Sequence, residues 1–125
     1  MNKLSAEKEE YLKLIYYYDG HIELVGNNQI AKHLGLSNPS VTEMFQKLSK
    51  DNLVEYFPYK GVQLTKDGLK KVEQLQRKQK LLCIFFEYHL ECSEEEMTEL
   101  LNHLEHIDNQ LFFEKLEQFL DSKKL

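Results

Sequence analysis

The sequence is poor in the residues that build disulfide scaffolds, tight turns and membrane spans. Its 125 residues include two cysteines, Cys83 and Cys92, which are too few for a disulfide framework. Two prolines and five glycines leave little scope for an all-β fold with many turns. No apolar run approaches the roughly 18 residues of a transmembrane helix, and the N-terminus lacks the apolar core of a signal peptide. We therefore expect a cytoplasmic, mostly helical protein without a membrane partner.

Charge is unevenly distributed along the chain. Residues 66–90 contain six basic and three acidic side chains, whereas residues 91–125 contain three basic and ten acidic ones. The total of −5 does not exclude DNA binding, because a local basic face is enough for phosphate contacts. We expect the last third of the chain to face away from nucleic acid.

Apolar periodicity and capping residues predict a mainly α-helical fold with one small β-hairpin. The order of the elements is that of a winged helix-turn-helix followed by a helical dimerisation domain. This predicts a DNA-binding domain over residues 1–68 and a dimerisation and metal-binding domain over 69–125. The predicted helices cover 5–18, 27–34, 37–50, 66–88, 93–104 and 109–120, and the predicted strands cover 53–56 and 62–64.

The third helix has the composition of a DNA-recognition helix. Its first turns carry small polar side chains, which allow a helix backbone to approach base edges in the major groove. Two lysines follow where phosphate contacts are expected, and a third occupies the hairpin tip, where a wing touches the backbone or minor groove. Alternatively, the polar residues are helix caps and the lysines a solvated face. The predicted DNA-binding residues are Ser37, Asn38, Pro39, Ser40, Thr42, Glu43, Lys47, Lys50 and Lys60. Glu43 fits least, because its charge repels phosphate, although it can accept a hydrogen bond from a cytosine amino group.

Nearly the whole chain resembles the DtxR/MntR family of metal-dependent transcriptional repressors, and the resemblance is densest in two segments. They are residues 37–48, which end in Gln-Lys-Leu, and residues 53–65, which contain Leu-Val-Glu-Tyr and Pro-Tyr-Lys-Gly-Val. The resemblance implies a homodimer that binds palindromic operator DNA, with Mn²⁺ or Fe²⁺ as corepressor. It also implies the short, manganese-regulator-like form, without the SH3-like domain of longer members.

The resemblance implies metal ligands on the first helix, the long helix and the helix near residue 100. Glu10 stands at the first-helix ligand position, and Glu105 and His106 form the family's Glu-His pair. Asn102 replaces the usual Glu or Cys. Glu10, Asn102, Glu105 and His106 make a mainly oxygen set that suits Mn²⁺ or Fe²⁺. Gln79, at a position where the family has His, and Cys83, four residues later, are further candidates.

One departure from the family pattern leaves the metal response open. Lys13 stands at the second acidic position of the first helix, where it places a positive charge beside a bound cation. Its ammonium group can pair with Glu10 or Glu105 and replace the metal. Two mechanisms therefore remain: a metal that promotes operator binding, or metal-independent DNA binding with a degenerate metal site.

Two other function classes compete with a regulator. A winged helix used for protein–protein contact needs an apolar recognition face, whereas residues 37–50 are polar. A metal-dependent enzyme built on Glu10, Glu105 and His106 lacks a nucleophile–base pair, a glycine-rich phosphate loop and an H-E-x-x-H motif. The sequence therefore favours a transcription repressor and no enzymatic activity.

Overall fold

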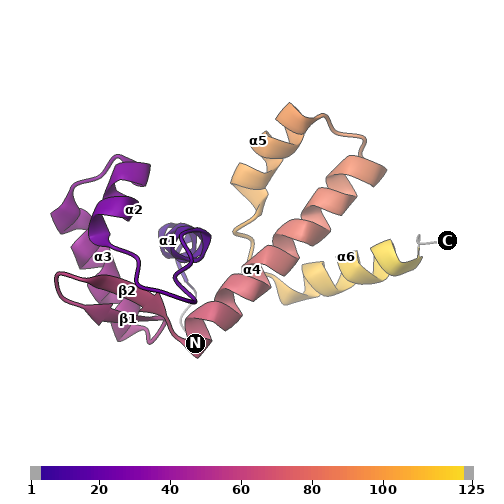
Figure 1. Ribbon diagram of the computed structural model, residues 1–125. Helices are drawn as coiled ribbons and strands as arrows, with labels where there is room; N and C mark the ends of the chain where they lie inside the picture. The colour runs from indigo at the N-terminus through magenta and orange to yellow at the C-terminus, as the bar shows by residue number, and fades with distance from the viewer. Residues whose placement is uncertain (1–3, 123–125) are drawn as a thin grey trace. The chain divides into compact units, whose positions relative to one another are not determined.

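The computed structural model describes residues 4–122, which form a winged helix-turn-helix followed by further helices (Figure 1). This confirms the predicted fold class. No helix within the described residues is long and apolar enough to cross a membrane. The elements are α1 (Ala6–Tyr17), α2 (Asn27–Leu34), α3 (Asn38–Lys50), β1 (Val54–Phe57), β2 (Gly61–Leu64), α4 (Lys66–Ile84), a π-helical segment η1 (Phe85–His89), α5 (Glu94–Leu104) and α6 (Gln110–Ser122).

The chain divides into two compact units between Glu73 and Gln74. The N-terminal unit contains α1 to β2 and the start of α4. The C-terminal unit contains the rest of α4, η1, α5 and α6. The predicted domain boundary after residue 68 stays a prediction.

Capping fixes the helices of the N-terminal unit close to their predicted ends. Ser5 caps α1 by accepting a hydrogen bond from the Lys8 amide. Gly35 ends α2 in the left-handed conformation (φ +67°), which glycine adopts without steric cost. Ser37 then caps α3, and Pro39 lies in its first turn, where a missing amide hydrogen does no harm. The result is a tight turn between the two helices of the helix-turn-helix.

The hairpin forms as predicted, with β1 displaced by one residue and β2 beginning one residue earlier than its predicted range. β1 and β2 pair antiparallel, with Val54 opposite Leu64 and Phe57 opposite Gly61. A third chain segment joins them, because Val25 exchanges two backbone hydrogen bonds with Val62, of 2.8 and 2.9 Å. This isolated bridge was not expected from the sequence. It ties the loop before α2 to β2, one residue pair away from the pair that flanks the turn.

One apolar core supports the N-terminal unit. The inner face of α3 is buried against α1, α2 and the hairpin, and burying a large apolar side chain contributes about 1.5–3 kcal/mol. The opposite face of α3 is exposed to solvent. The fully buried side chains include Leu12, Ile15, Ile30, Val41, Phe45, Leu48, Val62 and Val72.

The C-terminal unit has a smaller core between α4 and α6. The prediction of one helix to Tyr88 is wrong in its last turn, which is π-helical from Phe85 to His89. There the Leu90 amide donates to the Phe85 carbonyl, five residues back, and the Cys92 amide donates to the Phe86 carbonyl. The core side chains are Leu82, Phe86, Phe113, Leu116 and Leu120.

Candidate nucleic-acid interface and metal ligands

The N-terminal end of α3 presents its polar side chains to solvent. Ser37, Asn38, Pro39 and Ser40 are all exposed. The Ser37 hydroxyl accepts from the Ser40 amide at 3.3 Å and donates to the Ser40 hydroxyl at 2.9 Å. The cap is thus formed while the Ser40 hydroxyl keeps hydrogen-bonding capacity for a partner. The capping and the DNA-binding interpretations of these residues are compatible.

Asparagines from α2 hold two of the predicted recognition residues. The Asn27 side-chain amide donates to the Thr42 hydroxyl at 2.6 Å, and Thr42 is half-buried. The Asn38 side-chain amide donates to Oδ1 of Asn28 at 2.7 Å. Thr42 is therefore partly committed to the protein, and its own hydroxyl hydrogen remains available to donate.

The charged residues of α3 lie on its exposed face. Lys47 Nζ lies 3.4 Å from a Glu43 carboxylate oxygen, and both side chains are more than half exposed. An exposed pair at this spacing is weak, about 0.3–0.5 kcal/mol, so both groups can exchange it for DNA contacts. The lysine also offsets the negative charge of Glu43 toward phosphates. Lys50, in the last turn of α3, is exposed as well.

An open groove of about 570 Å³ runs between the exposed face of α3, the start of α2 and the wing. The predicted residues Asn38, Thr42 and Lys60 line it. Sequence reasoning missed other residues of this groove. Gln46 lies one helical turn after Thr42, a spacing that could have identified it; by contrast, no local pattern placed α2 beside α3. The missed lining residues include Asn27, Asn28, Gln29, Gln46, Tyr56 and Tyr59.

In the N-terminal unit, Glu10 already lies beside a cationic side chain. Lys13 Nζ is 3.6 Å from Oε2 of Glu10, with both residues on α1. The pairing of Lys13 with Glu10, one of the two expected from the sequence, is therefore present. Glu10 is about half exposed, so its carboxylate remains accessible.

In the C-terminal unit, Glu105 and His106 lie together just after α5. Glu105 Oε1 is 3.4 Å from His106 Nε2, and their side chains are 10% and 20% exposed. Asn102, one helical turn before His106, is exposed, and Gln79 is half-buried on α4. The structure therefore places Glu10 in one unit and the other candidate ligands in the second unit.

The Cys83 thiol is held in its neutral form. Burial raises the pKa of Cys83 above its ordinary value, and the negative charges of Glu87 and Glu105 raise it further. A metal binds sulfur as thiolate, so a metal at Cys83 must displace a proton that this environment retains.

The Glu105–His106 pair fits a divalent cation. Adjacent ligands of an octahedral ion with bonds of about 2.1 Å stand about 3 Å apart, close to the 3.4 Å observed. A carboxylate and an imidazole are ligands that Mn²⁺ and Fe²⁺ accept. These two residues can thus hold one metal ion as neighbouring ligands.

Comparisons with known proteins find relatives with a similar sequence and fold. Residues 3–62 match the family model "Iron dependent repressor, N-terminal DNA binding domain". A helix-turn-helix transcriptional regulator of Methanocaldococcus jannaschii, MJ0568, is 30% identical over 97% of this chain and 98% of its own length. The crystal structure of ScaR with bound Zn²⁺ is 38% identical, with a TM-score of 0.81 over 94% of this chain. The manganese regulator SloR is 36% identical, with a TM-score of 0.75 over 98% of this chain.

The chain spans 55% of ScaR and 57% of SloR, so the similarity covers little more than half of each longer protein. It nevertheless includes both units described here. The match to MJ0568 extends over nearly the full length of both chains. The protein therefore belongs to the DtxR/MntR family of transcriptional regulators.

Proposed function

We propose that the protein is a cytoplasmic homodimeric repressor that binds palindromic operator DNA and responds to Mn²⁺ or Fe²⁺. We assign it no enzymatic activity. The observation that carries this proposal is the groove in which the polar face of α3 and the wing lie together. The metal response rests on the fit of the Glu105–His106 pair and on the relatives, one a manganese regulator and one holding Zn²⁺.

DNA contact follows from the chemistry of the exposed face. In this proposal, the first turn of α3 enters the major groove, where the hydroxyl of Ser40 and the amide of Asn38 reach base edges. Lys47 and Lys50 contact phosphates, and Lys60 contacts the backbone from the wing. A protein-interaction module would need an apolar surface here, and the α3 residues 37–40 are exposed and mostly polar.

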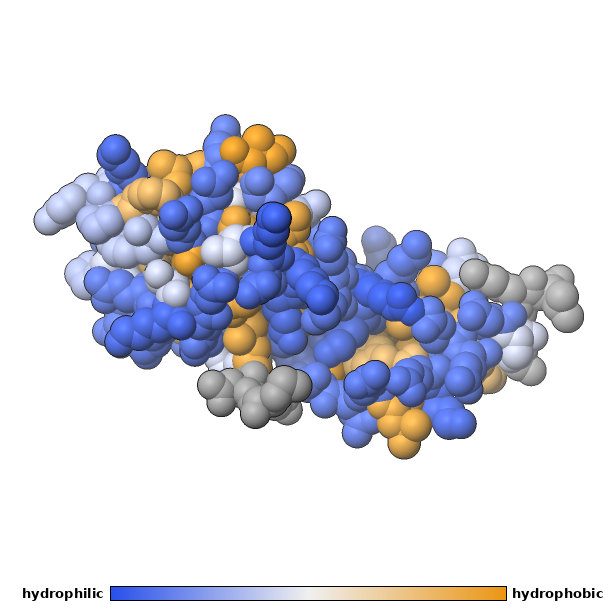
Figure 2. Space-filling view, turned by 90° about the horizontal axis from the view of Figure 1, so that it is seen from below, coloured by the Kyte–Doolittle hydropathy of each residue, from blue (hydrophilic) through white to orange (hydrophobic). Residues whose placement is uncertain are grey.

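A dimer is favoured by apolar surface that the single chain leaves uncovered. None of the residues of α5, all of which the structure describes, is fully buried, although the helix is amphipathic. A second copy of the chain would cover such a surface by a symmetric interface. In the view of Figure 2, hydrophilic residues predominate and apolar ones form separate patches. Exposed apolar side chains of the C-terminal unit include Tyr88, Leu90, Leu111, Phe112 and Phe119.

The metal would be held by Glu105 and His106, with Glu10 and Asn102 as the further ligands implied by the family. A divalent cation bound by these residues would favour the DNA-binding state of the protein over its other states. Glu10 and His106 would provide oxygen and imidazole donors, and Asn102 a neutral amide oxygen. Gln79 and Cys83 stay candidates for an ancillary role.

Fluorescence anisotropy tests this proposal directly. The full chain is titrated against DNA from upstream of its own gene, with chelator and then separately with Mn²⁺, Fe²⁺ and Zn²⁺. Tightening of tenfold or more, which is about 1.4 kcal/mol of coupling, supports the metal response. A slope of log affinity against log salt concentration near −0.9 for each phosphate contacted supports DNA contact. The absence of DNA binding at low salt would contradict the proposal that the protein is a repressor.

Metal-independent binding is a second candidate, and the Lys13–Glu10 pair favours it. The lysine already supplies a positive charge where the metal would act. Tight DNA binding that is unchanged by chelator would select this mechanism over the first. The matched comparison is the Lys13→Glu protein, which restores an acidic residue at that position.

A further inference from the structure

The wing tip exposes an aromatic ring that the fold does not use. Tyr59 is fully exposed, with a relative accessible surface of 103%, the highest among the exposed large apolar residues. The neighbouring aromatic Tyr56 packs against the core and contacts Phe45. A side chain that packs on nothing contributes no burial energy to the folded state.

The backbone of Tyr59 is also unusual for its residue type. Residues 57–60 form a turn closed by a hydrogen bond from the Lys60 amide to the Phe57 carbonyl, at 2.9 Å. Pro58 occupies the second position and Tyr59 the third, where φ is +66°. This position of a type II turn normally holds glycine or asparagine. A tyrosine there carries steric strain and exposes an aromatic ring, and neither helps folding.

The strand residues next to this tip contact the loop before α2. At Gly61 (φ +125°), an added Cβ would lie 2.1 Å from the Val25 carbonyl oxygen, so the strand passes close to the loop before α2. Val62 is then fixed by its two hydrogen bonds to Val25. The proline before Tyr59 restricts the turn further. The backbone on both sides of Tyr59 is therefore restricted, which reduces the backbone entropy lost when this turn binds a partner.

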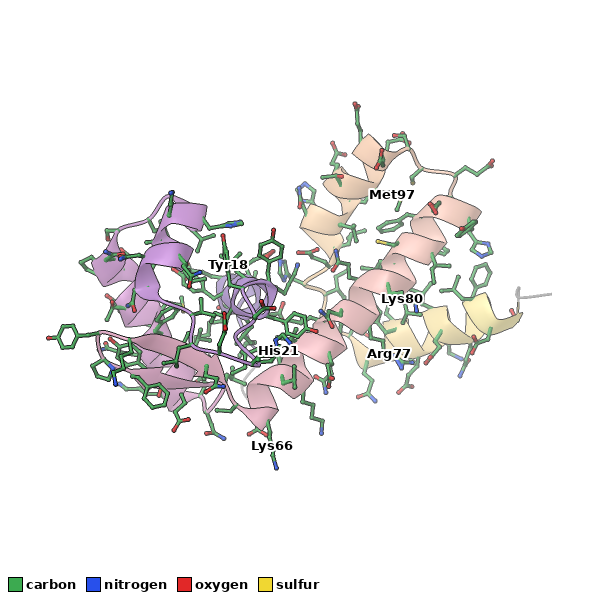
Figure 3. All side chains as sticks on the ribbon, in the orientation of Figure 1. Tyr18, His21, Lys66, Arg77, Lys80 and Met97 are labelled. Atoms are coloured by element: carbon green, nitrogen blue, oxygen red, sulfur yellow. The ribbon has the colours of Figure 1, made fainter. Side chains whose placement is uncertain are left out.

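The surroundings of Tyr59 match DNA. Lys60, the next residue, is exposed and positively charged. Both residues line the groove that also contains Asn38 and Thr42 of α3. With α3 in the major groove, a wing beside it reaches the adjacent minor groove. The ribbon of Figure 3, in the orientation of Figure 1, shows the hairpin beside α3 in the N-terminal unit.

We propose that Tyr59 enters the minor groove next to the site read by α3 and makes the protein prefer A·T pairs there. This rests on the proposed DNA binding. The ring packs against the sugar walls of the groove, and the hydroxyl donates to adenine N3 or thymine O2. A G·C pair places the guanine amino group in the groove, where it obstructs the ring and cannot accept the hydroxyl hydrogen.

The test uses duplexes that the wild-type full chain selects from a random library in the presence of Mn²⁺. Each selected duplex is made with A·T, G·C or inosine·C pairs at the flanking position. Inosine·C resembles G·C in the major groove and A·T in the minor groove, so it isolates minor-groove contact. Anisotropy is measured for the wild type, Tyr59→Phe and Tyr59→Asn, with Lys60→Gln as the neighbouring control.

We expect wild type to bind the A·T and inosine·C duplexes about tenfold more tightly than the G·C duplex. Tyr59→Asn should bind all three about equally, and Tyr59→Phe should lose part of the preference. Lys60→Gln should weaken all three equally. Because asparagine tolerates positive φ, the Tyr59→Asn protein should melt at or above the wild-type temperature.

Two results would overturn the inference while leaving DNA binding intact. One is a Tyr59→Asn protein with wild-type affinity and flank preference. The other is an inosine·C duplex that binds like G·C, since the preference would then arise outside the minor groove. Failure of the wild type to select any duplex would instead overturn the proposed DNA binding, and with it this inference.

Discussion

The ammonium nitrogen of Lys13 lies 3.6 Å from Oε2 of Glu10, a predicted metal ligand. We expect Lys13→Glu to tighten Mn²⁺ binding about tenfold. It removes a positive charge that would repel the divalent ion by about 2 kcal/mol at 4 Å in water, and it adds a carboxylate. Isothermal titration with Mn²⁺ measures the change. Lys8→Gln is the control, because Lys8 is on the same helix and pairs with Asp51 instead; equal affinities of Lys13→Glu and wild type would contradict the prediction.

Glu105→Ala should abolish any metal response and leave the fold intact. The variant removes the carboxylate that stands 3.4 Å from His106 Nε2, and ligand number decides metal affinity. Anisotropy with operator DNA, with and without Mn²⁺, measures the response. His103→Ala is the matched control, since His103 is exposed on the preceding turn. A metal response of wild-type size in the Glu105→Ala protein would exclude this residue as a ligand.

Ser40→Glu should abolish operator binding without lowering the melting temperature. Ser40 is exposed, so the substitution disturbs no core contact but places a negative charge against phosphate. We expect at least a hundredfold loss of affinity in anisotropy titrations. Gln118→Glu adds the same charge at an exposed position of α6 and should change affinity little. Wild-type affinity of the Ser40→Glu protein would contradict the docking of α3 in the major groove.

Two glycines with positive φ should differ in their tolerance of alanine. Gly35→Ala adds backbone strain alone, because nothing lies within 4 Å of the new Cβ, and should cost about 1 kcal/mol. Gly61→Ala adds greater strain, because φ is +125° and lies outside the left-handed helical region, and it adds a clash with the Val25 carbonyl oxygen. It should cost at least about 2 kcal/mol more. Urea unfolding of both variants measures this. Equal losses would mean that the backbone at Gly61 is more adaptable than the structure indicates.

Alkylation of Cys83 should report the charges around it. Burial and the charges of Glu87 and Glu105 raise the pKa of the thiol, so little thiolate exists at neutral pH. The alkylation rate should therefore rise at a higher pH than it does for an ordinary cysteine. Glu87→Gln removes one raising charge and should move the curve to lower pH, with faster reaction at pH 8. Iodoacetamide kinetics in a Cys92→Ser background, with chelator present, measure this. Glu99→Gln, exposed on α5, serves as control; an unmoved curve in Glu87→Gln would mean that Glu87 does not contribute to the raised pKa.

Much of the architecture could be predicted because its signals are local. Ser5, Ser37 and Ser93 cap the helices whose predicted ranges begin at residues 5, 37 and 93, and Gly35 follows the predicted last residue of α2. These interactions span three or four residues, so the sequence contains both partners. The π-helical end at Phe85–His89 was missed, because helical periodicity does not distinguish four- from five-residue hydrogen bonding.

The candidate sites were predictable in residue type and less so in contacts. The exposure of Ser40 and Lys50 follows from helical spacing, since the opposite face carries Val41 and Leu48. The hydrogen bond from Asn27 to Thr42 joins residues 15 positions apart, and no sequence pattern predicted it. Tyr59 was overlooked because its significance lies in a turn conformation that tyrosine seldom adopts.

The sequence by itself determined the helices, their caps, the hairpin and the residue types offered to DNA and metal, because periodicity and capping act between near neighbours. Only the tertiary structure decided that Val25 bridges Val62, that the wing tip projects Tyr59, and that Glu105 and His106 stand 3.4 Å apart. Those relationships depend on how packed elements and turns orient side chains in space. Burial of the common core of the N-terminal unit, rather than any short motif, fixes the wing beside α3.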